Sequence, residues 1–176
     1  FPEVLFESCA SGGGRFDPGM LYYAPQGWVS DDSDAVERLK IQYGTSMCYP
    51  LSSMGSHVSV IPNHQVFRNT PLHTRANVAY FGTFGYELDL NKLSDAEIEE
   101  VKAQIRFMKE YRELLQFGTF YRLKSPFNGN ETVWMVVSED KSKALVGYYR
   151  VLNGVNLPYS CVKLQGLDPD KLYENE

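Results

Sequence analysis

The sequence predicts an α/β protein in two parts, a parallel α/β region in residues 1–124 and an antiparallel β region in residues 125–176. In the first part, short apolar segments that favour strands alternate with helical segments, which is typical of a parallel sheet covered by helices. After a turn-rich stretch at residues 125–130, β-branched and aromatic residues gather on both sides of a polar turn at residues 139–143. That pattern is typical of a β-hairpin.

Four strands and two helices are expected in the first part. The strands are expected at residues 4–8, 28–30, 47–53 and 78–81, each a short run rich in apolar residues. A helix is expected over residues 35–43, because apolar residues recur there at the spacing of one helix face and a glycine follows. A longer amphipathic helix is expected over residues 95–116, since Ser94 and Glu97 form a capping-box pattern at its start.

The second part is expected to form a hairpin from residues 132–137 and 144–152, with residues 161–164 as a further strand. Four parallel strands fit either of two architectures, a small open sheet or half of an eight-stranded barrel. A half-barrel would leave strand edges that need a partner. The hydrophobic pattern does not choose between them.

Composition limits the classes of protein that fit. The chain has 176 residues, 43% of them hydrophobic, which is enough for one sizeable core. A net charge of -5 without a Lys/Arg cluster argues against a nucleic-acid partner, and no apolar run is long enough for a membrane span. Three widely spaced cysteines favour a reducing compartment, so we expect a cytoplasmic protein. The histidine spacing does not match a metal site, and no metal or cofactor is expected.

The run from Trp28 to Asp34 places three carboxylates behind a tryptophan at an expected strand-to-helix junction. One of Asp31, Asp32 or Ser33 is expected to cap the following helix, because such side chains accept hydrogen bonds from first-turn amides. Another of the acids could be catalytic, since active sites in α/β proteins lie at the carboxyl ends of strands. Both interpretations are open on these residues alone.

A glycine triplet, Gly12 to Gly14, directly follows the first expected strand. Glycines there let backbone amides approach a phosphate or a sugar hydroxyl, although a merely tight turn explains them equally well. The triplet matches neither a P-loop nor the spaced dinucleotide fingerprint. Cys9 could act as a thiol nucleophile only with a histidine base that the sequence does not bring near it.

Several long motifs resemble those of microbial α-galactosidases of glycoside hydrolase family 36. They are LFESCASGGGRFD at residues 5–17, SDDSDAVERLKIQYG at residues 30–44, SMGSHVS at residues 53–59, PNHQ at residues 62–65 and FGYELD at residues 84–89. The resemblance covers nearly the whole chain.

The resemblance implies a retaining glycosidase on a (β/α)₈ TIM barrel. This chain resembles the second half of that barrel, followed by part of a C-terminal antiparallel β-domain. By similarity Asp31 is the general acid/base. By similarity, the subsite that holds galactose is formed by Cys9, Ala10, Ser11 and Gly12. The resemblance also implies, less directly, two further pocket residues, Arg15 and Trp28.

Strand geometry agrees with one catalytic acid in this run. Neighbouring strand residues point to opposite faces, so Asp31 and Asp32 cannot both reach one glycosidic oxygen unless the chain turns sharply. We therefore assign the helix cap to Asp32 or Ser33.

The family's nucleophile is an aspartate in a Lys-Trp-Asp motif, which this chain lacks. We expect the chain alone to be inactive and to need the upstream rest of the catalytic domain as its partner. The expected substrates of the parent protein are α-galactoside oligosaccharides such as raffinose and melibiose. Transfer of galactose to another sugar instead of water shares the same intermediate. The resemblance further implies a homo-oligomeric parent.

Two other classes are open. A non-catalytic carbohydrate-binding module would bind galactose without needing the Asp31 carboxylate. A structural half-barrel fragment would show neither binding nor turnover and would associate through its strand edges.

Overall fold

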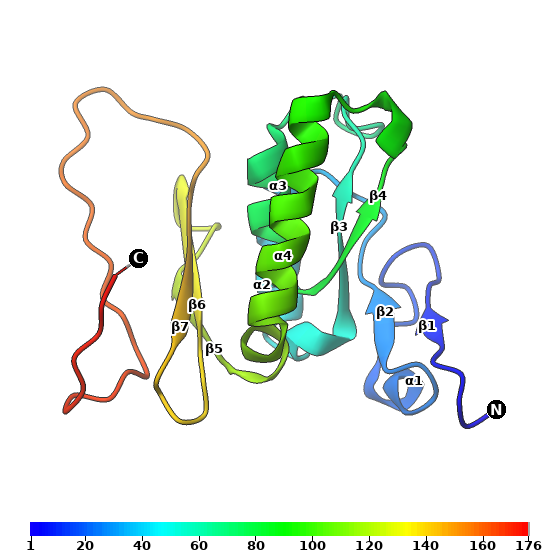
Figure 1. The fold of residues 1–176 in the computed structure, drawn as a ribbon, viewed down its shortest axis with the longest axis horizontal. Helices are drawn as coiled ribbons and strands as arrows, with labels where there is room; N and C mark the ends of the chain where they lie inside the picture. Colours follow the sequence, from blue (N-terminus) through cyan, green and yellow to red (C-terminus); the bar gives the residue numbers. More distant parts are fainter. Residues whose placement is uncertain (176) are drawn as a thin grey trace.

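A four-stranded parallel sheet forms one side of the molecule (Figure 1). The computed structural model describes residues 1–175. The strands lie in the order of the sequence, β1-β2-β3-β4, and every neighbouring pair is parallel. Their bounds are β1 Glu7–Ser8, β2 Gln26–Trp28, β3 Met54–Ser59 and β4 Thr83–Glu87. The expected parallel α/β region is therefore confirmed.

Helices cover one face of this sheet. The α-helices are α1 Pro18–Tyr23, α2 Ala35–Thr45, α3 Leu72–Ala79 and α4 Asp95–Phe117, with short 3-10 turns at η1 Leu51–Ser53 and η2 Leu90–Lys92. The layer of α2, α3 and α4 lies between the parallel sheet and a second sheet (Figure 1). The capping box at Ser94 and Glu97 is present, which confirms the start expected for α4.

The second sheet is antiparallel and consists of β5 Thr119–Lys124, β6 Glu131–Val137 and β7 Ala144–Arg150. The expected hairpin is β6 and β7, joined through the polar turn. Trp134 of β6 is fully buried, and its ring lies 5.5 Å from that of Phe81, in the turn between α3 and β4. The core is therefore continuous from the parallel sheet through the helices to the second sheet.

Three expected strands are wrong. Residues 47–53 form a turn and η1, and the strand begins only at Met54. Residues 78–81 are the end of α3 and the turn after it, because their apolar side chains complete the buried face of a helix. Short apolar runs do not distinguish a strand from a buried helix turn. Residues 161–164 have no regular structure, and β5 provides the third strand of the antiparallel sheet.

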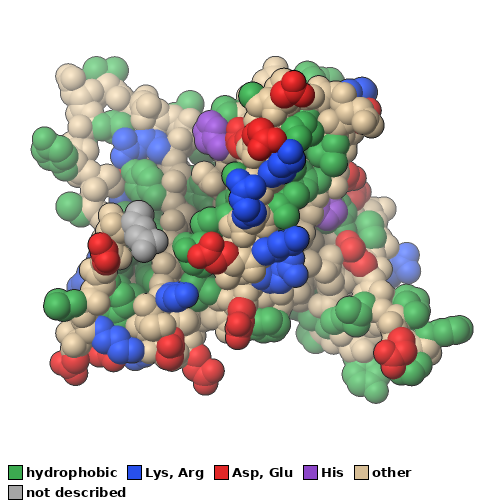
Figure 2. Space-filling model, viewed as in Figure 1, with side chains coloured by type: hydrophobic (Ala, Val, Ile, Leu, Met, Phe, Trp, Pro, Cys, Tyr) green, Lys and Arg blue, Asp and Glu red, His purple; other side chains and the backbone are tan. Residues whose placement is uncertain are grey.

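Apolar side chains remain exposed around β1 and α1. Figure 2 shows hydrophobic side chains gathered at this end of the molecule, whereas Lys and Arg mix with Asp and Glu over α4. The exposed residues at this end are Phe1, Val4, Leu5, Phe6, Tyr22 and Tyr23. None of the helices within residues 1–175 has both the length and the hydrophobicity needed to cross a membrane.

Candidate functional site

Two loops meet at the carboxyl ends of β1 and β2. Residues 9–14 follow β1, and residues 29–34 follow β2. Gly12 is buried with φ +71°, and a methyl group built on it would lie 2.8 Å from the amide nitrogen of Asp31. A Cβ at Gly13 would lie 2.8 Å from the carbonyl oxygen of Val29. The glycines are therefore required for close packing of the two loops.

Asp31 lies at the point where this junction meets solvent. Its side chain is exposed and makes no hydrogen bond or ion pair within the described part of the chain. The neighbouring acid differs, since Asp32 accepts a hydrogen bond from the Asp34 amide at 3.0 Å. Asp31 is thus the acid in this run whose carboxylate is free to meet a ligand.

The helix cap is Asp34, which corrects the assignment to Asp32 or Ser33. The Asp34 carboxylate accepts hydrogen bonds from the amides of Val36 and Glu37, both at 3.0 Å, and it pairs with Arg68. Its side chain is 1% exposed. The turn between strand and helix is longer than the sequence pattern indicated, so the cap comes one or two residues later than expected.

The remaining predicted site residues lie on the loop after β1 or next to the two loops, since Arg15 directly follows the first loop and Trp28 ends β2. Ser11 has a positive φ of 52°, and an isolated bridge joins Ala10 to Gly13. Cys9 is a free thiol and Arg15 is exposed.

A row of side chains across the sheet was missed by sequence reasoning. The Trp28 ring stacks on His57 with centroids 4.4 Å apart, and His57 Nδ1 lies 3.6 Å from a Glu87 carboxylate oxygen. Two glycines make room for this row, since a Cβ at Gly55 would lie 2.9 Å from the Trp28 ring and one at Gly85 would lie 3.1 Å from the His57 ring. The available signal was a glycine two residues before His57 and another two residues before Glu87, because such pairs share one face of a strand.

Arg38 of α2 joins this row, with its Cζ atom 4.1 Å from the centroid of Trp28. Burial lowers the pKa of Arg38 to about 10, an effect opposed first by the Asp32 carboxylate and then by those of Glu87 and Asp31. Arg38 therefore stays charged at neutral pH. Its interactions with three carboxylates show that they share one electrostatic environment.

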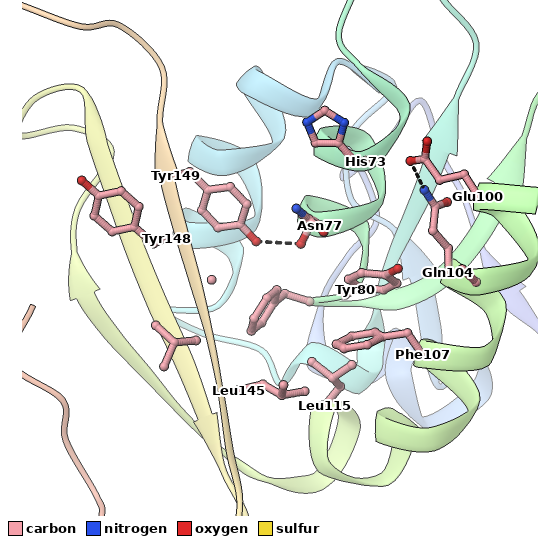
Figure 3. A pocket seen from close by; sticks show the side chains of 14 residues that line it. His73, Asn77, Tyr80, Glu100, Gln104, Phe107, Leu115, Leu145, Tyr148 and Tyr149 are labelled. Carbon is pink, nitrogen blue, oxygen red and sulfur yellow. Dashed lines mark hydrogen bonds between the residues drawn. The ribbon is translucent and has the colours of Figure 1, made fainter. Parts of the chain in front are cut away.

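A hollow of about 670 Å³ lies elsewhere, between α3, α4 and β7. Figure 3 shows two hydrogen bonds between residues of its wall. The Tyr149 hydroxyl donates to the carbonyl oxygen of Asn77, and the Gln104 amide donates to Glu100. Its walls are mostly aromatic and aliphatic. The hollow lies on the helix side of the parallel sheet, so it is separate from the Asp31 junction.

The described residues contain no group of three or more His, Cys, Asp or Glu side chains that could hold a metal ion. The chemistry available at the junction is that of one free carboxylate beside a glycine-lined loop and an aromatic row. A free acid at the carboxyl ends of parallel strands is typical of the active sites of α/β enzymes.

The chain belongs to the Melibiase family, whose model matches residues 1–118. Residues 131–176 match the family model described as the glycosyl hydrolase family 36 C-terminal domain. The resemblance to glycoside hydrolase family 36 drawn from the sequence motifs is thereby confirmed.

Curated relatives are α-galactosidases. Alpha-galactosidase AgaA of Geobacillus stearothermophilus is 61% identical over 176 residues, which are 100% of this chain and 24% of that protein. Alpha-galactosidase Mel36A of Lactobacillus acidophilus is 53% identical over 175 residues, 99% of this chain and 24% of that protein. The chain therefore spans about a quarter of the length of these relatives.

Solved structures of the same family share the fold. A crystal structure of an AgaA variant from G. stearothermophilus in complex with raffinose has a TM-score of 0.93 and 62% identity, and the match covers 96% of this chain and 23% of that one. The galactosidase domain of AgaSK, an α-galactosidase-sucrose kinase, has a TM-score of 0.94 and 50% identity, with coverage of 97% and 24%.

Proposed function

We propose that this chain supplies the acid/base part of the active site of a retaining α-galactosidase. The observation that carries the proposal is the free, exposed carboxylate of Asp31, packed through its backbone against Gly12 at the carboxyl ends of β1 and β2. In a retaining mechanism this acid protonates the leaving oxygen, and it then takes a proton from the water that opens the glycosyl-enzyme. Asp31 has this role in the proposal.

The galactose subsite is built from the neighbouring loop in this proposal. Backbone amides of residues 9–12 face the sugar hydroxyls, because the buried glycine lets the chain approach a ligand closely. Arg15 and Trp28 complete the pocket. His57 and Arg38 both lie against the Trp28 ring, so the ring offers its remaining surface to the sugar.

The parallel sheet is half of a (β/α)₈ barrel in this proposal. The C-terminal β-domain, expected from residue 125 on, then also includes β5, because β5 pairs with β6 in the antiparallel sheet. Two observations support a missing half, the exposed apolar side chains around β1 and the length of the relatives. The partner is the rest of the catalytic domain, which supplies the nucleophile. The parent is proposed to be homo-oligomeric and cytoplasmic, and the three exposed free cysteines support a reducing compartment.

The proposed substrates are α-galactosyl oligosaccharides of the raffinose and melibiose type. Support comes from relatives of the same family in complex with raffinose and with stachyose. The test is turnover of raffinose by the full-length parent protein, compared with its Asp31→Asn variant. We expect a loss of at least about 10²-fold, because general acid catalysis contributes 10² to 10⁴. Unchanged turnover in the Asp31→Asn variant, or saturable galactose binding without any turnover in the wild type, would overturn the proposal.

A further inference from the structure

A single side chain, that of Arg38, holds the backbone on both sides of Asp31. Arg38 is the fourth residue of α2 and is 3% exposed. Its Nε donates a hydrogen bond to the carbonyl oxygen of Asp32 at 2.8 Å, and its Nη2 donates to the carbonyl oxygen of Ser30 at 2.8 Å. Because a guanidinium is planar and rigid, the two carbonyls that flank Asp31 are fixed relative to each other.

The rest of the Arg38 guanidinium joins this loop to the sheet. Nη1 donates to the carbonyl oxygen of Gly55 at 3.3 Å, and the guanidinium lies over the Trp28 ring. Trp28 and Gly55 are paired residues of β2 and β3. The Arg38 side chain therefore holds the loop that carries Asp31 in place against two neighbouring strands.

We propose that Arg38 is a positioning residue for the general acid/base, fixing residues 30–32 so that the Asp31 carboxylate meets the glycosidic oxygen. The inference rests on the proposed function, because it takes Asp31 as the acid. No side-chain bond within residues 1–175 holds the Asp31 carboxylate. Its placement therefore depends on its backbone, which is held by Arg38 and packed against Gly12. A shift of about 1 Å at a reacting group costs about 10²-fold in rate.

Arg75 provides a matched control within the chain. It is the fourth residue of α3 and is 5% exposed. Its Nε donates to the carbonyl oxygen of Thr70 at 2.9 Å, and its Nη1 donates to that of Ser59 at 2.6 Å. Arg75 thus makes the same kind of bonds at the same position of the next helix, but to the last residue of β3 and to the loop after β3, which does not carry Asp31.

The experiment compares Arg38→Lys with Arg75→Lys in the full-length parent protein. Lysine keeps the charge, but its single ammonium cannot reproduce the fixed fork of donors. Each variant is assayed on raffinose, whose leaving sugar needs protonation, and on an aryl α-galactoside with an activated leaving group, which departs without it. The quantity compared is kcat/KM, because it reports the step in which the leaving group departs.

We expect Arg38→Lys to lower kcat/KM for raffinose by about 10- to 100-fold, and kcat/KM for the activated aryl substrate by less than about 3-fold. Asp31→Asn should show the same selectivity with a larger loss on raffinose. Arg75→Lys should change both substrates by the same factor. Retained turnover of the aryl substrate also shows that the Arg38→Lys protein is folded.

If Arg38→Lys lowers kcat/KM by the same factor for both substrates, the proposal is overturned, and the role of Arg38 is structural only. If Arg38→Lys lacks a cooperative unfolding transition, Arg38→Gln takes its place in the same assays. Failure of both variants to fold would also overturn the proposal that Arg38 positions the acid. A separate outcome concerns the proposed function. If the wild type fails to cleave either substrate, or Asp31→Asn cleaves raffinose normally, the acid assignment is wrong whatever Arg38 does.

Discussion

Gly12 lies directly against the backbone of Asp31. A methyl group on Gly12 would lie 2.8 Å from the Asp31 amide nitrogen and 2.7 Å from the Cα atom of Ser30. Its φ of +71° is also in the region that side chains rarely adopt. The loop after β1 and the loop after β2 are thus one packed unit, and a change in either loop moves the other.

The first prediction follows from this contact. Gly12→Ala in the full-length parent should lower kcat/KM for raffinose by about 10²-fold, because the added methyl must push the Asp31 backbone away. The matched control is Gly44→Ala, since Gly44 is an exposed glycine of α2 with no atom near its Cβ position. That variant should keep its activity and gain up to about 1 kcal/mol of stability. Wild-type activity in Gly12→Ala would show that the contact does not position Asp31.

The second prediction concerns the Asp34 carboxylate, which is buried, caps α2 and pairs with Arg68. Asp34→Ala should lower the free energy of unfolding by about 2 kcal/mol, because it removes the cap and one of the two carboxylates that pair with Arg68. Asp34→Ser keeps an oxygen that accepts the first-turn amides, so it should cost about 1 kcal/mol less. Denaturant unfolding of the two variants measures the difference, and equal losses would mean that the cap contributes nothing.

The parts of the fold that sequence predicted are those with strong local signals. The capping box at Ser94 and the long apolar stripe fix α4, and the polar turn between β-branched segments fixes the β6–β7 hairpin. The segment at Val78 was misassigned because its burial comes from packing between α3 and the sheet, which a short apolar run does not reveal. The strand β4, which follows it, has only partly buried residues and so gave a weak signal.

For the site, residue type narrowed the candidates without deciding between them. The acid run and the glycine triplet each had a structural explanation, as a helix cap and as a tight turn, and the choice of Asp31 as the acid came from the resemblance to glycoside hydrolase family 36. The role of Arg38 could not be read from the sequence, since an arginine on an amphipathic helix is ordinarily solvent-facing. Its burial depends on carbonyl groups from two separate segments, the loop after β2 and the strand β3, and only the folded chain brings those together.

The third prediction is a pH dependence in the antiparallel sheet. The pKa of Glu131 lies well below its ordinary value of 4.5, first because Lys124 bonds to its carboxylate and then because Tyr148, Arg150 and Ser160 do. A lowered folded-state pKa adds stability that is fully present above about pH 4.5 and is lost as the pH falls toward the folded value.

The variant that isolates this effect is Glu131→Gln. Its melting temperature should fall furthest below that of the wild type at neutral pH, and the gap should narrow below about pH 4.5. Glu139→Gln is the control, because Glu139 is exposed on the β6–β7 turn and makes no hydrogen bond among residues 1–175. A gap of constant size from pH 7 to pH 3 would show that the Glu131 charge does not stabilise the sheet.

The last prediction is that residues 1–176 alone have no glycosidase activity. A retaining mechanism needs a second carboxylate about 5–5.5 Å from the acid. Among the other acids near Asp31, Asp32 and Asp34 accept hydrogen bonds from backbone amides, and a Glu87 carboxylate oxygen lies 3.6 Å from His57 Nδ1. Purified chain is incubated with an aryl α-galactoside, with the full-length parent as the positive control and heat-killed chain as the blank. Turnover above the blank would mean that one of these acids acts as the nucleophile, and the division of the site proposed above would be wrong.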